Sequence, residues 1–173
     1  MNKKFLTSFF TAIILQDMKI KIIVVGKTRE KYLQIGEKDF SGRLSNYCQF
    51  ERIVVKEEKI QASKNEVTIK EQEGKRILDK VANTALMVAL DQRGEQLSSE
   101  KLAGFIQNEM NKGTKEIDFV IGGALGLGEN VMAKASKKMS LSEMTFTHEM
   151  VRLILLEQLY RAFAILAGSK YHK

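Results

Sequence analysis

The stretch Ile117–Gly128, with the sequence IDFVIGGALGLG, joins an apolar run to the most glycine-dense segment of the chain. A short apolar run that ends at turn-forming residues is typical of a buried strand. We therefore predict a strand over Ile117–Ile121 and a tight loop over Gly122–Gly128. Glycines let the backbone approach a ligand closely, because they carry no Cβ. The loop is thus a candidate binding site at a strand end.

Two common phosphate-binding loops do not fit this segment. The P-loop requires Lys after its last glycine, but Glu129 follows Gly128. The pattern G-x-G-x-x-G is incomplete as well, because Val131 stands where its third glycine is required. The loop therefore suits a ligand without phosphates, and an ordinary strand-to-helix turn is the alternative.

Strands and helices alternate on both sides of this loop. Apolar runs predict further strands over Ile20–Val25, Phe50–Val55 and Ala85–Leu90, and an extended segment over Met139–Phe146. Apolar spacing and capping residues predict helices over Arg29–Leu44, Glu71–Val81, Glu129–Lys137 and His148–Ala167, and a further helix that Ser98 or Ser99 caps and that runs to about Met110. The remaining long segments are predicted to be a mobile connection over Lys56–Lys70 and a turn over Gln92–Gln96.

This alternation predicts an α/β fold in which a mostly parallel sheet is sandwiched by helices. In such sheets, ligands bind at the carboxyl ends of the strands. Three predicted ends are marked by unusual residues: Leu90–Asp91, Gly122–Gly123 and Ser142–Phe146. The last helix is apolar on most sides, so we expect a partner chain to cover one of its faces.

Length and composition limit the class of protein. The chain has 173 residues, which fits one domain, and its 44% hydrophobic and 28% charged residues exclude a disordered chain and a polytopic membrane protein. The lone Cys48 cannot form an internal disulfide or a CxxC metal clamp, so we expect a cytoplasmic protein without metal. The net charge of +7 favours polyanionic partners such as nucleic acid, although lysines also serve solubility alone.

The amino-terminal residues differ from the rest of the chain. Lys3 and Lys4 precede the uncharged run Phe5–Leu15, which is shorter than the roughly 20 residues that span a bilayer. No A-x-A cleavage pattern follows this run. We therefore expect a single domain over residues 18–173, preceded by an extension over residues 1–17 that lies outside the fold.

Several separated motifs together resemble the RlmH family of SPOUT methyltransferases. In chain order they are MKIKIIVVGK from Met18, VALDQRG from Val88, the glycine loop, LSEMTFTHEMVR from Leu141, LLEQLYRAFAI from Leu155 and YHK from Tyr171. Members usually have Pro where Thr147 stands, and residues 1–17 have no counterpart in the family.

The resemblance implies a fold, a reaction and partners. It implies a trefoil knot in the carboxyl-terminal half, which is an exception to the rule that chains avoid knots. It also implies a homodimer that uses S-adenosylmethionine to methylate N3 of a pseudouridine in 23S ribosomal RNA, acting on assembled ribosomes. Basic residues would then neutralise RNA phosphates; candidates are Lys27, Arg29, Lys31, Lys137 and Lys138.

Carried onto this sequence, the resemblance also implies site residues. The cofactor pocket would be lined by Leu90, Gly122, Gly123, Leu141, Ser142, Glu143, Met144, Thr145 and Phe146. Adenine requires an apolar slot with backbone donors and acceptors, which these residues can provide. The alternative for Leu141–Phe146 is an ordinary buried strand.

Methyl transfer from a sulfonium mainly requires that the two reactants are positioned and that charge is managed. We expect His172, Tyr171 and Arg152 near the methyl group, with His172 accepting the proton of the target nitrogen and Arg152 stabilising negative charge. His148 lies next to the pocket segment in sequence. The alternatives are that His148 merely starts a helix and that the terminal Tyr-His-Lys is a frayed tail.

Two other classes of function compete with this interpretation. A non-catalytic basic α/β RNA-binding module explains the charge but leaves the glycine loop without a role. A flavodoxin-like nucleotide-binding protein explains the sheet, but it requires an early phosphate-binding loop, and Gly26–Glu30 contains one glycine.

Overall fold

The structure, a computed structural model, describes residues 17–59, 65–169 and 171. Of the predicted extension over residues 1–17, Asp17 alone falls within these residues, so the extension stays a prediction. Among the described helices, none is long and apolar enough to cross a membrane.

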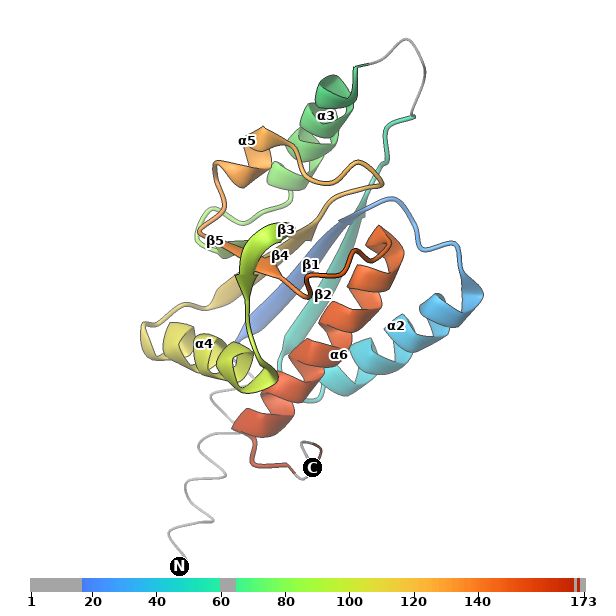
Figure 1. Cartoon of the computed structure of the whole chain (residues 1–173). Coiled ribbons are helices and arrows are strands. Elements are labelled where there is room, and N and C mark those ends of the chain that lie inside the picture. The colour runs from blue at the N-terminus through green and yellow to red at the C-terminus, as the bar shows by residue number, and fades with distance from the viewer. Residues whose placement is uncertain (1–16, 60–64, 170, 172–173) are drawn as a thin grey trace, which may run out of the picture.

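The described strands form one five-stranded sheet in the order β2-β1-β4-β3-β5, and every neighbouring pair is parallel (Figure 1). The prediction of a mostly parallel sheet is therefore confirmed. The central strand β4 is the one that leads into the glycine loop. The bounds are β1 (Lys19–Val25), β2 (Gln49–Val55), β3 (Leu86–Gln96), β4 (Glu116–Ile121) and β5 (Lys137–Ser140).

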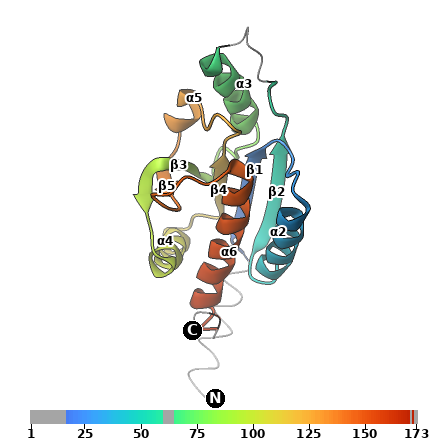
Figure 2. The same cartoon turned by 45° about the vertical axis from the view of Figure 1, so that its right-hand side comes forward.

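Helices cover both faces of this sheet (Figures 1 and 2). One face carries α2 (Lys31–Leu44), α4 (Ser99–Asn111) and α6 (His148–Leu166), and the other carries α3 (Glu66–Leu78) and α5 (Glu129–Met132). Because α6 contacts both α2 and α4, more than one of its sides is buried within the chain. The cover by a partner chain stays a prediction.

The two faces of β1 show how the sequence produces these layers. Ile20, Ile22 and Val24 point to the α2, α4 and α6 face, whereas Ile23 and Val25 point to the α3 and α5 face. Successive side chains alternate across a strand, so an unbroken apolar run is buried on both faces. Burial of these residues fixes the carboxyl end of β1 beside that of β4.

Two predicted boundaries around β3 and β5 are wrong. The turn predicted over Gln92–Gln96 belongs to β3, because a register shift after Leu90 lets Glu95 and Gln96 pair with β5. The helix predicted over Glu129–Lys137 ends at Met132, and Lys137 already pairs with β3. Strand pairing with a distant segment overrides the local helical pattern here.

The predicted start of α3 is also wrong, here because of a local capping interaction. Helix α3 begins at Glu66 rather than Glu71, because the Asn65 side chain accepts a hydrogen bond from the Val67 amide at 3.0 Å. The predicted mobile connection is therefore shorter, and residues 60–64 of it lie outside the described residues. The extended segment predicted over Met139–Phe146 is a strand only as far as Ser140.

Candidate functional site

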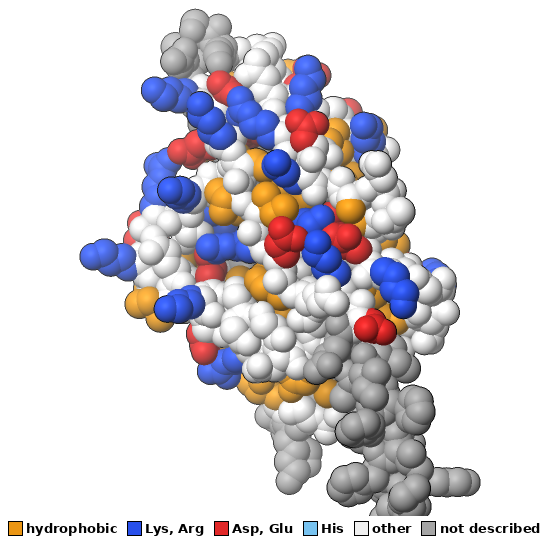
Figure 3. All heavy atoms as spheres, turned by 180° about the vertical axis from the view of Figure 1, so that it is seen from behind, with side chains coloured by type: hydrophobic (Ala, Val, Ile, Leu, Met, Phe, Trp, Pro, Cys, Tyr) orange, Lys and Arg blue, Asp and Glu red, His pale blue; other side chains and the backbone are white. Residues whose placement is uncertain are grey.

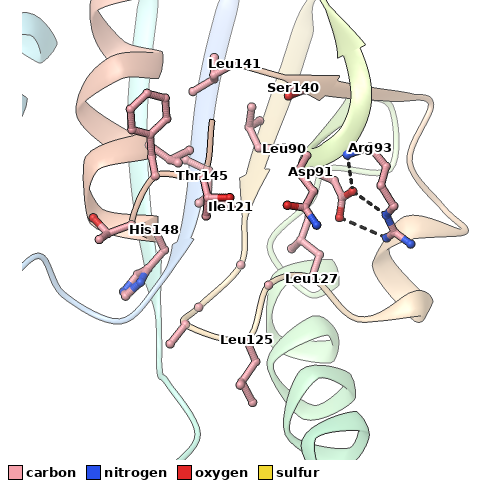
Figure 4. A pocket seen from close by; sticks show the side chains of 18 of the residues that line it. Leu90, Asp91, Arg93, Ile121, Leu125, Leu127, Ser140, Leu141, Thr145 and His148 are labelled. Atoms are coloured by element: carbon pink, nitrogen blue, oxygen red, sulfur yellow. Dashed lines mark hydrogen bonds and ion pairs between the residues drawn. The ribbon is translucent and has the colours of Figure 1, made fainter. Parts of the chain in front are cut away.

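A cavity of about 730 Å³ lies at the carboxyl ends of β3, β4 and β5. Its walls come from the end of β3, from the glycine loop after β4 and from the segment that joins β5 to α6. Figure 4 shows Thr145 and His148 on one side of the cavity and Leu90, Asp91 and Leu127 on the other. The volume falls within the roughly 300 to 1,000 Å³ of small-molecule sites.

The glycine loop closes on itself. A Cβ on Gly122 would lie 2.5 Å from the carbonyl oxygen of Gly126 and 2.7 Å from the amide nitrogen of Leu127, so a larger residue does not fit there. The Gly126 amide donates a hydrogen bond to the Gly123 carbonyl at 3.0 Å, and Gly126 itself has a φ of +83°. The loop thereby presents the backbone of its glycines and the side chains of Leu125 and Leu127 to the cavity (Figure 4).

The end of β3 contributes an apolar wall and a charged rim. Leu90 faces the cavity, and the carboxylate of Asp91 accepts hydrogen bonds from the amide of Arg93 at 2.9 Å and from its Nε at 2.8 Å (Figure 4). These bonds lower the pKa of Asp91. The rim is therefore an ion pair in which Arg93 remains largely exposed.

The segment between β5 and α6 is held by its own polar side chains. The Ser140 hydroxyl donates to the carbonyl of Ser142 at 2.9 Å, and the amide of Met144 donates to the Ser142 hydroxyl at 2.9 Å. At the start of α6, the Thr147 hydroxyl accepts the Met150 amide at 3.2 Å. Thr147 is therefore the N-cap that ends this segment and begins the helix.

His148 stands where the segment meets the cavity. Its imidazole is half-buried, and burial together with the charge of Arg152 lowers the pKa of His148. A neutral imidazole at this position avoids placing a further positive charge beside the cavity.

The structure brings the predicted cofactor residues together, with the exception of Glu143, which does not line the cavity. Leu127, Val151 and Lys70 also line it. The sequence did not indicate Lys70, because the helix predicted there begins at Glu71, one residue after Lys70. Leu127 lies within the predicted loop, yet no pattern distinguished it from its neighbours.

The three predicted catalytic residues are placed differently. Arg152 is 1% exposed, and its guanidinium donates to the carbonyls of Val25 at 2.5 Å and Gly26 at 3.0 Å and to the hydroxyl of Thr28 at 3.0 Å. It therefore ties α6 to the end of β1 and does not line the cavity.

Tyr171 lies at the opposite end of α6 from the cavity. Its ring packs edge-on against Tyr160 at 4.6 Å between centroids and faces Arg161. The 19 residues of α6 span about 28 Å at the usual rise of an α-helix. Within one chain the structure thus does not bring Tyr171 to the cavity, and His172 lies outside the described residues.

The cavity shows no sign of a metal centre. In the part of the chain that the structure describes, no group of three or more His, Cys, Asp or Glu side chains is arranged to hold a metal ion. The candidate site is lined by apolar side chains, by the backbone of the glycine loop and by a few polar and charged side chains.

Solved structures support the fold. The chain is similar to a probable methylase family protein from Haemophilus influenzae Rd KW20, with a TM-score of 0.51 at 14% sequence identity over 92% of this chain and 71% of that chain. At this identity, the likeness concerns the fold alone.

Sequence comparisons extend this likeness to the family. Proteins named Ribosomal RNA large subunit methyltransferase H match 90% of this chain: those from Clostridium beijerinckii and Clostridioides difficile are 43% and 45% identical over 100% of their length, and that from Geotalea daltonii is 44% identical over 99%. The family described as "Predicted SPOUT methyltransferase" matches residues 18–172. This chain belongs to the SPOUT methyltransferase family.

Proposed function

We propose that this protein methylates large-subunit ribosomal RNA with S-adenosylmethionine, at N3 of a pseudouridine and on assembled ribosomes, in the cytoplasm. The observation that supports this proposal most strongly is the cavity at three strand ends in a chain of the SPOUT methyltransferase family. Relatives at 43% to 45% identity are named as ribosomal RNA large subunit methyltransferases. The trefoil knot implied by the family resemblance is part of the same proposal.

The residues of the cavity fit the cofactor. Leu90, Leu127 and Leu141 offer an apolar slot for a flat heterocycle, and the adjoining backbone offers donors and acceptors. At Gly122 a Cβ would collide with the backbone of Gly126 and Leu127, so the closed shape of the loop that lines the cavity depends on glycine at this position. No phosphate-binding lysine follows the loop, in agreement with a cofactor that carries no phosphate.

S-adenosylmethionine supplies an electrophilic methyl group on a positively charged sulfur. The chain has to orient the target base, exclude water and remove the proton from the target nitrogen. We assign proton removal to His172, with Tyr171 beside it, and the holding of the cofactor to the cavity residues. Arg152 is a positioning residue in this scheme, since its guanidinium is occupied by the end of β1.

The position of Tyr171, at the start of the carboxyl-terminal tail over residues 171–173, supports a homodimer. Tyr171 of one chain lies about a helix length from its own cavity, so the tail has to reach the cavity of a second copy. We therefore propose that each active site combines the cavity of one protomer with residues 171–173 of its partner.

The distribution of charge fits a folded RNA. On the face seen in Figure 3, Lys and Arg side chains lie at several separate places rather than in one compact patch. A dispersed positive surface favours contacts to the phosphates of a preformed shape over the reading of single bases. Whole ribosomes should therefore be better substrates than an isolated stem-loop.

Purified protein with methyl-labelled S-adenosylmethionine tests this proposal. We expect label to enter the RNA of ribosomes isolated from cells that lack the protein, and to enter a naked stem-loop poorly. Equal labelling of both RNAs would contradict the requirement for assembled ribosomes. Absence of cofactor binding by calorimetry at high micromolar concentration would favour a non-catalytic RNA-binding module instead.

A further inference from the structure

A second cavity, of about 460 Å³, adjoins the first one and shares the wall made by residues 123–125 and His148. Its lining is acidic. Among the described residues, four carboxylates and two cationic side chains line it: Glu57, Glu58, Glu73, Glu149, Arg29 and Lys59. An excess of negative charge therefore lies directly behind the glycine loop.

Glu73 is the buried member of this group. The residue is 5% exposed, and its Oε1 accepts the amide of Glu58 at 2.9 Å. Its Oε2 lies against the glycine loop, because a Cβ on Gly123 would be only 3.0 Å from that oxygen. The absence of a side chain at Gly123 thus lets the carboxylate sit immediately behind the backbone that lines the first cavity.

The described guanidinium groups near Glu73 form ion pairs with other carboxylates. The nearest guanidinium on its own helix, that of Arg76, donates to Glu58 at 2.5 Å and to the Lys56 carbonyl at 2.9 Å. Arg29 pairs with Glu57 at 2.8 Å. Among the described residues, no Lys, Arg or His forms an ion pair with Glu73. A buried carboxylate without an ion-pair partner is costly, and a group of this kind beside a cavity is a candidate for a role in the function of the site.

The described lining of the first cavity carries no net negative charge, because its one carboxylate, that of Asp91, is paired with Arg93. Its charged residues are Lys70 and the rim pair of Asp91 and Arg93, which leaves an excess of positive charge. S-adenosylmethionine carries a sulfonium, whereas its demethylated product has a neutral sulfur. The lining alone would therefore favour the product over the cofactor.

We infer that Glu73 determines cofactor specificity, an inference that rests on the proposed function. The carboxylate of Glu73 lies against Gly123, on the far side of the glycine loop from the first cavity. Its negative charge favours the sulfonium of S-adenosylmethionine over the neutral sulfur of the product. Glu73 acts across the loop and touches neither ligand. The pKa of Glu73 is raised overall, because burial and the charges of Glu57 and Glu58 outweigh the hydrogen bond from the Glu58 amide and the charge of Arg76. A cation bound nearby lowers the pKa of a carboxylate and so opposes the effect of burial, which favours the charged form when the cofactor is present.

The test is a calorimetric titration of wild type and E73Q with S-adenosylmethionine and, separately, with S-adenosylhomocysteine. Glutamine is nearly isosteric and retains an oxygen for the Glu58 amide, so E73Q removes the charge and keeps the packing. We expect affinity for the sulfonium ligand to fall on the order of three- to tenfold, the effect of one charge acting through protein. Affinity for the neutral product should stay within about twofold.

Two further variants separate charge from shape. Glu71 is exposed on the same helix, so E71Q removes an equal charge that water screens and should change neither affinity. E73D keeps the charge but shortens the side chain, so it should retain the preference for the sulfonium even where both affinities fall.

The inference is overturned if E73Q weakens both ligands equally, which indicates a packing role, or if it weakens neither. Loss of the preference in E73D would contradict it as well. A wild-type protein that binds neither ligand would instead refute the proposed function on which the inference rests.

Discussion

Gly122 is the residue on which the shape of the cavity depends most directly. A methyl group there would overlap the Gly126 carbonyl at 2.5 Å, and this neighbour is backbone that cannot move aside alone. We expect G122A to lower the affinity for S-adenosylmethionine by at least about tenfold, because the whole loop must shift. Isothermal titration calorimetry measures this effect.

Gly104 provides the matched control, because a Cβ there meets open space on α4. G104A should bind the cofactor as wild type does and should be more stable by about 0.5 to 1 kcal/mol, since alanine favours a helix. Equal binding by G122A and wild type would show that the loop does not shape the site.

His148 makes stability depend on pH in a defined direction. Its pKa in the folded chain is lowered by burial and by Arg152, so the folded state prefers the neutral imidazole. The unfolded chain takes up a proton near pH 6.5, and the folded chain does so only at lower pH. The stability contributed by the neutral form is therefore complete above about pH 6.5 and is lost as the pH falls below it.

Urea unfolding at about pH 7.5 and about pH 5.5 measures this loss. H148Q cannot titrate, so its free energy of unfolding should fall less between the two pH values than that of wild type. A fall of the same size in both proteins would contradict the assignment.

At the scale of elements, Arg152 holds α6 to the end of β1. In R152Q the carbonyls of Val25 and Gly26 lose their donors in a buried place, so we expect a loss of about 3 kcal/mol in the free energy of unfolding. Urea denaturation provides the value. Arg43 on α2 is exposed and pairs with Asp39, so R43Q should change stability little. A normal stability in R152Q with reduced methyl transfer would instead support a catalytic Arg152.

The elements themselves were largely predictable, because apolar runs that are buried on both faces have a strong local pattern. Strand β4 follows this rule, and the glycine loop after it was predictable from its turn-forming residues. The end of β3 and the short helix α5 did not, since both depend on the pairing of β5 with β3. Lys137 and Lys138 carry no apolar signal of a strand, and that pairing cannot be found from local sequence.

The site was predictable where a motif supplied it. The glycine loop and the segment after β5 line the cavity as the family resemblance implied, although Glu143 does not. The role of Arg152 could not be predicted, because its partners are backbone carbonyls up to 127 positions away in sequence. Glu73 belonged to a predicted helix, yet nothing in the pattern indicated that it would be buried against Gly123.

At the scale of the whole molecule, the proposed active site requires two copies of the chain. G122A damages the cavity and H172A damages the tail, so each variant alone should lose most of its methyl transfer to ribosomes. After the two are unfolded together and refolded, about half of the dimers are mixed, and one of the two sites in each mixed dimer is intact. About a quarter of wild-type activity should return.

No recovery in the mixture, with each variant inactive alone, would show that the tail does not cross to a partner. Full activity of H172A alone would remove the tail from the reaction.

We propose that the cavity at the carboxyl ends of β3, β4 and β5 serves the methylation of ribosomal RNA. Mass spectrometry of nucleosides from large-subunit ribosomal RNA tests it most directly, in cells with the protein, without it, and with the gene restored as wild type or G122A. We expect that one methylated pseudouridine disappears without the protein, returns with wild type and fails to return with G122A. An unchanged set of methylated nucleosides in cells without the protein would contradict it.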